Sequence, residues 1–244
     1  MGTFSEGVLR TIERAYETPM NPDLRTKILL NGTWQLQPSN DETIPTRWNH
    51  SVTVPALVDI AEPRCDWKSF KYHYCRRTFK VSTEAELAYV VIEQAMFGTD
   101  VWLNGKRLGC DIACYTSQEY DCRSALKSGT NELIVRVGQR ENLPAHSAVG
   151  KDQERTEWIP GIWGDVYLLC CGNPRVELVQ VIPHIATSTA EVRVTVENLS
   201  EKEIAFSCNA FVCEKKSGKK GSEHLEAQST IAPNGKDLYL QASD

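Results

Sequence analysis

The sequence predicts an all-β protein made of two sandwiches, and three observations carry this prediction. Short apolar runs with a period of two dominate the chain from residue 28 onward, as in strands with one buried face. The dipeptide Asn104-Gly105 separates two such runs and favours the positive φ angles of a type I′ hairpin turn. A change of pattern at Gly172-Asn173-Pro174 divides residues 28–173 from residues 174–244, because Pro174 cannot continue a paired central strand.

The composition is that of an ordinary globular protein. The 244 residues are 41% hydrophobic and 24% charged, which excludes a disordered or collagen-like chain. The net charge of -5 provides no positive field that would gather phosphate backbones, so we expect no nucleic-acid binding. No apolar run approaches the roughly 20 residues that cross a bilayer, so we expect no membrane-spanning segment.

Residues 1–27 precede the predicted strands and are expected to hold one short amphipathic helix. Apolar and charged side chains interleave from Glu6 to Tyr16, and Thr3 stands three residues before Glu6, as in a capping box. A secretory signal needs an unbroken apolar stretch, which this segment lacks. We therefore expect a cytoplasmic protein, or a periplasmic or secreted one if a leader has been removed.

The nine cysteines are expected to be reduced thiols. Their number is odd, and the neighbours Cys170 and Cys171 do not suit a regular disulfide framework. Reduced thiols favour a reducing compartment. Cys110 and Cys114 have the spacing of a zinc half-site, but no second pair or nearby histidine completes four ligands. The sequence therefore predicts no metal and no cofactor.

The strands of the first region are recognised one by one. Residues 87–92 are apolar on both faces, as in a strand buried inside a sandwich. The runs on either side of Asn104-Gly105 form a hairpin, and successive side chains alternate, so Trp102 and Leu103 should lie on opposite faces. Residues 162–169 are predicted to be the last strand of this region.

The second region has cleaner alternation and fewer strands than a complete sandwich. Ala190, Val192, Val194 and Val196 face one way, and the pattern repeats from Ile204 onward. We count five strands here, whereas an immunoglobulin-type sandwich has about seven. An unfinished sandwich leaves an open edge, so we expect that the chain continues or that another chain covers this edge.

Several segments occur in one recognisable order along the first region. They are Asn31-Gly32-Thr33-Trp34, Val52-Thr53-Val54-Pro55, Tyr72 to Phe79, Val101-Trp102-Leu103-Asn104-Gly105, Tyr120-Asp121, Gly129 to Leu133, and Gly161 to Leu168. In this order and spacing the chain resembles the amino-terminal half of glycoside hydrolase family 2, which contains β-galactosidases, β-glucuronidases and β-mannosidases. The resemblance covers residues 28 to about 240.

The resemblance implies a fold and a function. The fold is a galactose-binding-like jelly roll followed by an immunoglobulin-like sandwich, which in the family precedes a catalytic (β/α)8 barrel. The function is that of a non-catalytic amino-terminal portion of a β-glycosidase, which supplies scaffold and part of a substrate pocket. Its implied partners are a carbohydrate substrate, bound through the full-length enzyme, and the barrel itself.

Two departures put the sugar subclass in doubt. The family commonly has an arginine where this chain has Gly164, and a glycine-rich aromatic pattern where this chain has residues 113–118. Turn chemistry alone explains the Asn104-Gly105 hairpin and Asn131, so these motifs predict fold and not function.

No catalytic residue is expected in this chain. A (β/α)8 barrel alone takes about 250 residues, and retaining hydrolysis needs two carboxylates roughly 5 to 5.5 Å apart. The family's acid/base glutamate follows an asparagine, and this chain contains Asn131-Glu132. That pair lies where a turn enters a strand, so we interpret Glu132 as an exposed strand residue. The chain alone is predicted to be inactive.

The polar loop of residues 140–159 holds the candidate substrate-facing residues. Loops of this length are commonly functional or disordered. The resemblance implies that an acidic residue here reaches the sugar site, and Asp152 matches that position, with Glu154 close by. Trp158 and Trp163 could stack on a sugar ring, although Trp163 could equally belong to the core.

Two other functions remain open at this stage. One is a free-standing carbohydrate-binding module, which would need a complete second sandwich and an exposed aromatic platform. The other is an interaction protein that docks a partner by strand addition at the open edge. The coding sequence beyond Asp244 distinguishes these alternatives from a glycosidase portion.

Overall fold

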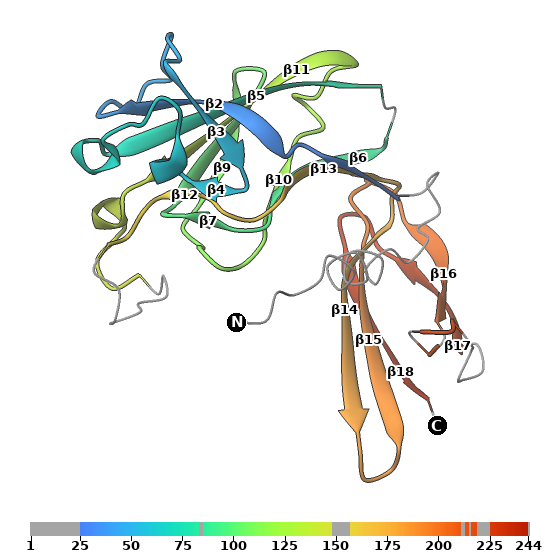
Figure 1. Ribbon diagram of the computed structural model, residues 1–244. Helices are drawn as coiled ribbons and strands as arrows, with labels where there is room; N and C mark the ends of the chain where they lie inside the picture. The colour runs from blue at the N-terminus through green and yellow to red at the C-terminus, as the bar shows by residue number, and fades with distance from the viewer. Residues whose placement is uncertain are drawn as a thin grey trace. The chain divides into compact units, whose positions relative to one another are not determined.

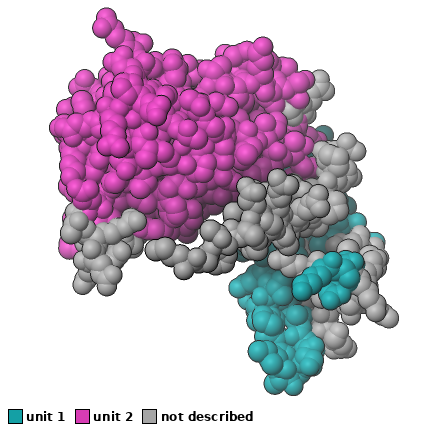
Figure 2. Space-filling view, viewed as in Figure 1, with its two compact units in different colours: residues 1–24, 171–244 teal, residues 25–170 magenta. Residues whose placement is uncertain are grey.

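The computed structural model describes residues 25–82, 85–147, 157–210, 213–214, 216–218 and 225–243. Residues 25–170 form one unit, and a second unit contains residues 171–244 (Figures 1 and 2). In the described ranges every regular element longer than three residues is a strand, so the all-β prediction is confirmed. The short helix expected near the start of residues 1–27, around Glu6 to Tyr16, lies outside these ranges. Within them, no helix has the length and apolarity to cross a bilayer.

The first unit is a sandwich with two main sheets and one small sheet (Figure 1). The larger sheet has the order β3-β2-β5-β11-β8-β9, the second β1-β13-β6-β10, and the small one β4-β12-β7. The strands are β1 (Arg25–Leu29), β2 (Gly32–Ser39), β3 (His50–Val54), β4 (Ala56–Leu57), β5 (Tyr72–Val81), β6 (Leu87–Ile92), β7 (Ala95–Met96), β8 (Thr99–Leu103), β9 (Lys106–Asp111), β10 (Gln118–Asp121), β11 (Gly129–Gly138), β12 (Gly161–Ile162) and β13 (Val166–Cys171). Short 3-10 turns lie at η1 (Val58–Ile60), η2 (Trp67–Ser69) and η3 (Arg140–Asn142).

The core lies between the two main sheets. Alternate residues of β5 and β11, among them Cys75, Leu133 and Val135, are buried there against residues of β6 and β13. Every residue of β6 is buried, which is why its sequence is apolar at each position. The period-two pattern therefore positions the sheets, because each strand turns its apolar face toward the other sheet.

The predicted hairpin joins β8 to β9. Asn104 and Gly105 have φ angles of 52° and 79°, as a type I′ turn requires. Leu103 is buried in the core, whereas the ring of Trp102 lies beside Tyr74, with its centroid 6.4 Å from the Tyr74 ring centroid. The two side chains thus occupy opposite faces, as the sequence predicts.

Two asparagine side chains fasten this hairpin to β11. Asn104 Nδ2 donates to the Ala125 carbonyl and to Asn131 Oδ1, each at 2.8 Å. Asn104 Oδ1 accepts from the Glu132 amide at 3.0 Å. The buried Asn131 carboxamide also bonds both backbone groups of Lys127. Turn chemistry is therefore the role of these motif residues.

The structure differs from the prediction for the last strand of the first unit. Residues 162–169 do not form one strand, because β12 ends at Ile162 and β13 begins at Val166. The amides of Trp163 and Gly164 both donate to the Gln94 carbonyl, at 3.1 and 3.0 Å. A Cβ at Gly164 would lie 2.6 Å from the Gln94 amide nitrogen. This close approach of two backbones leaves no room for a side chain at Gly164.

The second unit contains five strands in its described residues. Its sheets have the orders β14-β15-β18 and β16-β17. The strands are β14 (Arg175–His184), β15 (Thr189–Glu197), β16 (Ile204–Ala210), β17 (Leu225–Ile231) and β18 (Lys236–Ser243). Val194, Val196 and Ile231 form a small core, with Phe206 packed beside them.

Strand β14 lies at the edge of its sheet and is largely exposed. Val179 pairs with Val194 and Val181 pairs with Val192, and directly opposed side chains share a face of the sheet. Val179 and Val181 nevertheless remain 54% and 59% exposed. Among the described residues, little covers the core-facing side of this strand.

The first prediction concerns Asn131. The substitution Asn131→Ala removes four hydrogen bonds at a buried position and leaves backbone groups of the turn unpaired. We expect the free energy of unfolding to fall by about 3 kcal/mol in urea denaturation. Ser128→Ala, at an exposed position of the same turn, is the control and should change it by under about 0.5 kcal/mol. Equal effects would show that the network is dispensable.

Candidate functional site

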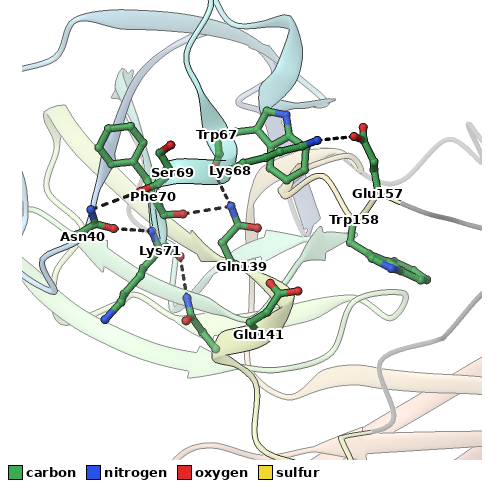
Figure 3. Close-up of a pocket in the computed structure, with 11 residues that line it drawn as sticks. Asn40, Trp67, Lys68, Ser69, Phe70, Lys71, Gln139, Glu141, Glu157 and Trp158 are labelled. Carbon is green, nitrogen blue, oxygen red and sulfur yellow. Dashed lines mark hydrogen bonds and ion pairs between the residues drawn. The ribbon is translucent and has the colours of Figure 1, made fainter.

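A pocket lies where three strands of the six-stranded sheet end or begin. Strand β2 ends opposite the start of β5, at Ser39 and Tyr72, and β11 ends opposite Tyr72 as well, at Gly138. The residues just beyond these strand ends therefore come together. The pocket has a volume of about 620 Å³. Its lining residues are Asn40, Trp67, Lys68, Ser69, Phe70, Lys71, Gln139, Glu141, Asn142, Glu157 and Trp158 (Figure 3).

Gln139 holds the segment before β5 in place. Its Nε2 donates to the carbonyls of Trp67 and Phe70, at 2.5 and 3.1 Å, and its amide donates to the Lys71 carbonyl at 2.9 Å. Asn142 Nδ2 donates to the same Lys71 carbonyl at 2.8 Å. Gln139 is only 9% exposed, so this wall of the pocket is pre-formed.

The charged groups of the pocket balance each other. Lys68 forms an ion pair with Glu157, and both side chains are more than half exposed. Lys71 and Glu141 are exposed and complete the set of two cations and two anions. The Asn40 carboxamide fixes the backbone at Lys71 by accepting its amide at 3.0 Å.

Trp158 and Trp163, two of the predicted sugar-facing residues, pack against one small hydrophobic cluster. This cluster contains Met96, Phe97 and Cys114 and lies apart from the main core. The Trp158 ring meets Phe97 edge-on at 6.2 Å between centroids, and the Arg140 guanidinium lies 4.7 Å from its centroid. In Figure 3 the Trp158 ring points away from the other lining side chains.

Trp163 is half-buried and meets Tyr115 edge-on, with ring centroids 5.5 Å apart. Its indole Nε1 is buried without a hydrogen-bond partner. Asp152 and Glu154, the other two predicted site residues, lie outside the described residues. Their role toward a sugar stays a prediction, as does that of the two tryptophans.

Glu132 takes the structural role that the sequence predicts for it. It lies on β11, and its carboxylate pairs with the Arg76 guanidinium at 3.4 Å. Arg76 also donates to Gln35 and stacks over the Trp48 ring at 4.4 Å. This arrangement lies on the outer face of the six-stranded sheet and has the form of a surface network.

Sequence reasoning missed most of the pocket. Trp67, Gln139 and Glu141 carry no motif, and they come from segments far apart in the chain. The length of the polar segment after residue 139 did indicate a functional loop at residues 140–159, but it did not single out individual pocket residues. Among the described residues, no group of three or more His, Cys, Asp or Glu side chains lies close enough to hold a metal ion.

His73 is a buried titratable group on β5, two residues after Lys71. It is fully buried, and neither ring nitrogen completes a hydrogen bond. Burial lowers the pKa of His73 to about 4, and the nearby backbone of Trp67 opposes this shift only in part. The imidazole is therefore neutral in the folded protein at ordinary pH.

Comparison with known proteins gives relatives of one kind. No family model matches the chain. In sequence, 120 residues are 33% identical to a β-galactosidase from Arthrobacter sp. (strain B7), over 47% of this chain and 10% of that protein. In structure, the chain is similar to a β-D-mannosidase from Dictyoglomus thermophilum, with a TM-score of 0.65 and 18% identity over 89% of this chain and 31% of that one. It is also similar to a family 2 β-galacturonidase from Eisenbergiella tayi, with a TM-score of 0.68 and 13% identity over 90% of this chain and 36% of that one.

The fold is the one found in the β-sandwich domains of these glycosidases. Within that class, the chain is similar to the amino-terminal part of glycoside hydrolase family 2, so the resemblance predicted from its motifs is confirmed. The chain spans a tenth of the β-galactosidase and about a third of the two solved structures.

The second prediction follows from the buried His73. Its lowered pKa means that the unfolded chain binds a proton more readily, so stability is full above about pH 6.5 and is lost as the pH falls toward 4. We expect His73 to account for a loss of about 2 kcal/mol in unfolding free energy between about pH 7 and about pH 5. His73→Leu should remove that part of the slope, measured by urea denaturation across this range. His146→Asn, at an exposed histidine, should retain it, and an unchanged slope in His73→Leu would disprove the assignment.

Proposed function

We propose that this chain is the non-catalytic amino-terminal portion of a β-glycosidase of glycoside hydrolase family 2. The observation that carries the proposal is the similarity of nearly the whole chain to the β-sandwich portion of such enzymes, together with the sequence identity to a β-galactosidase. In this role the first unit serves as scaffold and supplies part of a substrate pocket. The sugar is bound by the full-length enzyme.

The chemistry of the described residues favours a non-catalytic role for this chain. Retaining hydrolysis needs an acid/base carboxyl and a facing nucleophile. Glu132, the one glutamate that follows an asparagine as in the family motif, forms an ion pair with Arg76 on a sheet surface. The reaction is therefore assigned to a catalytic barrel elsewhere in the enzyme.

The exposed apolar face of β14 is evidence that further structure packs against this strand. Val179 and Val181 lie on the core-facing side of an edge strand and are more than half exposed. Exposed apolar edge strands commonly pair with, or pack against, additional protein structure. The occupant in this proposal is the rest of the enzyme, and a separate chain is the alternative. This edge is the specific observation that keeps an interaction protein as the second candidate function.

The candidate substrate-facing residues of the proposal are Asp152, Glu154, Trp158 and Trp163. Asp152 is assigned a positioning contact to the sugar, which the resemblance implies. A cytoplasmic location is also part of the proposal, and it suits nine cysteines that are all free thiols.

The third prediction tests inactivity. The chain alone should show no turnover of chromogenic β-galactoside, β-mannoside or β-glucuronide, because the two-carboxylate machinery is assigned outside it. Sequencing the gene beyond codon 244 should reveal a barrel of about 250 residues. Turnover by the chain that disappears on substitution of one of its own carboxylates would refute the proposal, as would a stop codon at that point.

The fourth prediction concerns Asp152. Asp152→Ala should change the unfolding free energy of this chain by under about 0.5 kcal/mol, as at ordinary surface sites. In the full-length enzyme the same change should lower kcat, because a positioning contact to the sugar is lost. Unchanged kinetics in the full-length variant would remove Asp152 from the proposed site.

A further inference from the structure

We propose that the pocket around Gln139 binds a neutral glycosyl unit and discriminates against a uronic acid. The inference deepens the proposed function, on which the choice of a sugar rests. The relatives include enzymes named for neutral sugars, galactose and mannose, and one named for the acidic galacturonic acid. The lining of this pocket is what separates the two kinds of ligand.

The first step is the orientation of Gln139. Both protons of its carboxamide are directed to the carbonyls of Trp67 and Phe70. These bonds turn Oε1 the other way, and Figure 3 shows it on the side opposite the segment that carries Trp67 and Phe70. No hydrogen bond from the described residues reaches this oxygen. A side chain that is 91% buried thus presents a fixed acceptor at the pocket wall.

The second step is the character of the neighbouring groups. In Figure 3 the Glu141 carboxylate lies on the same side of Gln139 as Oε1. Asn142 donates its Nδ2 to the Lys71 carbonyl, which leaves its oxygen as a further acceptor. These oxygens beside Gln139 are acceptors, and the hydroxyl groups of a sugar are donors that match them.

The third step is charge. A uronate needs a free cation near its carboxylate, and bidentate or charge-assisted pairing is the usual solution. Lys68 is already paired with Glu157. The Lys71 side chain extends away from Gln139 and Glu141 in Figure 3. The group that does face the pocket, Glu141, would repel a second carboxylate.

The fourth step is shape and apolar surface. Trp67 is half-buried, packs against the main core and is one of the residues that line the pocket. An aromatic ring beside a few placed polar groups is the usual make-up of a sugar site. The volume of about 620 Å³ lies within the range of about 300–1,000 Å³ that small-molecule sites occupy.

The test is an NMR titration of this chain, labelled with 15N, at neutral pH. The probes are methyl β-D-galactopyranoside, methyl β-D-mannopyranoside and the methyl β-glycoside of glucuronic acid. At least one neutral glycoside should bind with a Kd of about 1 mM and shift the side-chain amide of Gln139 and the indole N–H of Trp67. The uronide should bind about tenfold more weakly or not at all.

Three variants make the result specific. Glu141→Ala, at an exposed position, should raise the Kd of the neutral glycoside about fivefold, because one hydrogen bond is lost. Glu141→Gln keeps an acceptor and removes the charge, so it should retain neutral binding and improve binding of the uronide. Glu62→Ala, an exposed glutamate outside the lining, is the matched control and should leave both Kd values unchanged.

Three results would overturn the inference. They are tighter binding of the uronide that is lost in Lys71→Ala, shifts confined to residues outside the pocket, and no binding of any probe up to about 20 mM. None of them bears on the proposed function, which stands or falls on turnover by this chain and on the downstream coding sequence. Conversely, turnover by this chain would refute the proposed function and leave the binding result interpretable.

Discussion

The face-to-face packing of the two main sheets is the constraint on which the first unit depends. Strands β5 and β11 lie at the centre of the larger sheet, and their alternate residues, such as Cys75 and Val135, fill the core. A slip of one residue would turn the apolar set outward, so the register of these strands is fixed. That register also brings the ends of β2 and β11 to the start of β5, and the pocket is built on these ends.

Local patterns predicted the parts of the fold that local chemistry decides. The Asn104-Gly105 turn and the doubly buried β6 were both predicted, because turn dihedrals and strand burial are written in adjacent residues. The break between β12 and β13 was missed because its cause lies elsewhere in the chain. Gly164 interrupts the strand by meeting the backbone of Gln94, and no periodicity in residues 162–169 carries that information.

The candidate site was harder to predict for the same physical reason. Trp158 and Trp163 drew attention as aromatic residues near a polar loop, and both do lie together, on the cluster that contains Phe97. The pocket wall, however, depends on Gln139, whose importance comes from two carbonyls before β5. A glutamine after a strand is common in any sequence, so only the folded chain distinguishes it.

The motif residues on which the family resemblance rests join strands, and this limits what they indicate about a ligand. Asn31 donates to the Asp165 carboxylate at 2.8 Å and accepts the Val166 amide at 3.0 Å, which ties the start of β2 to β13. Asn104 does the same between the β8–β9 hairpin and β11. Such positions are restrained by partly buried hydrogen bonds between strands. An exposed lining residue such as Glu141 lies outside the strands that these bonds join, so the pocket lining can differ while the motifs stay the same.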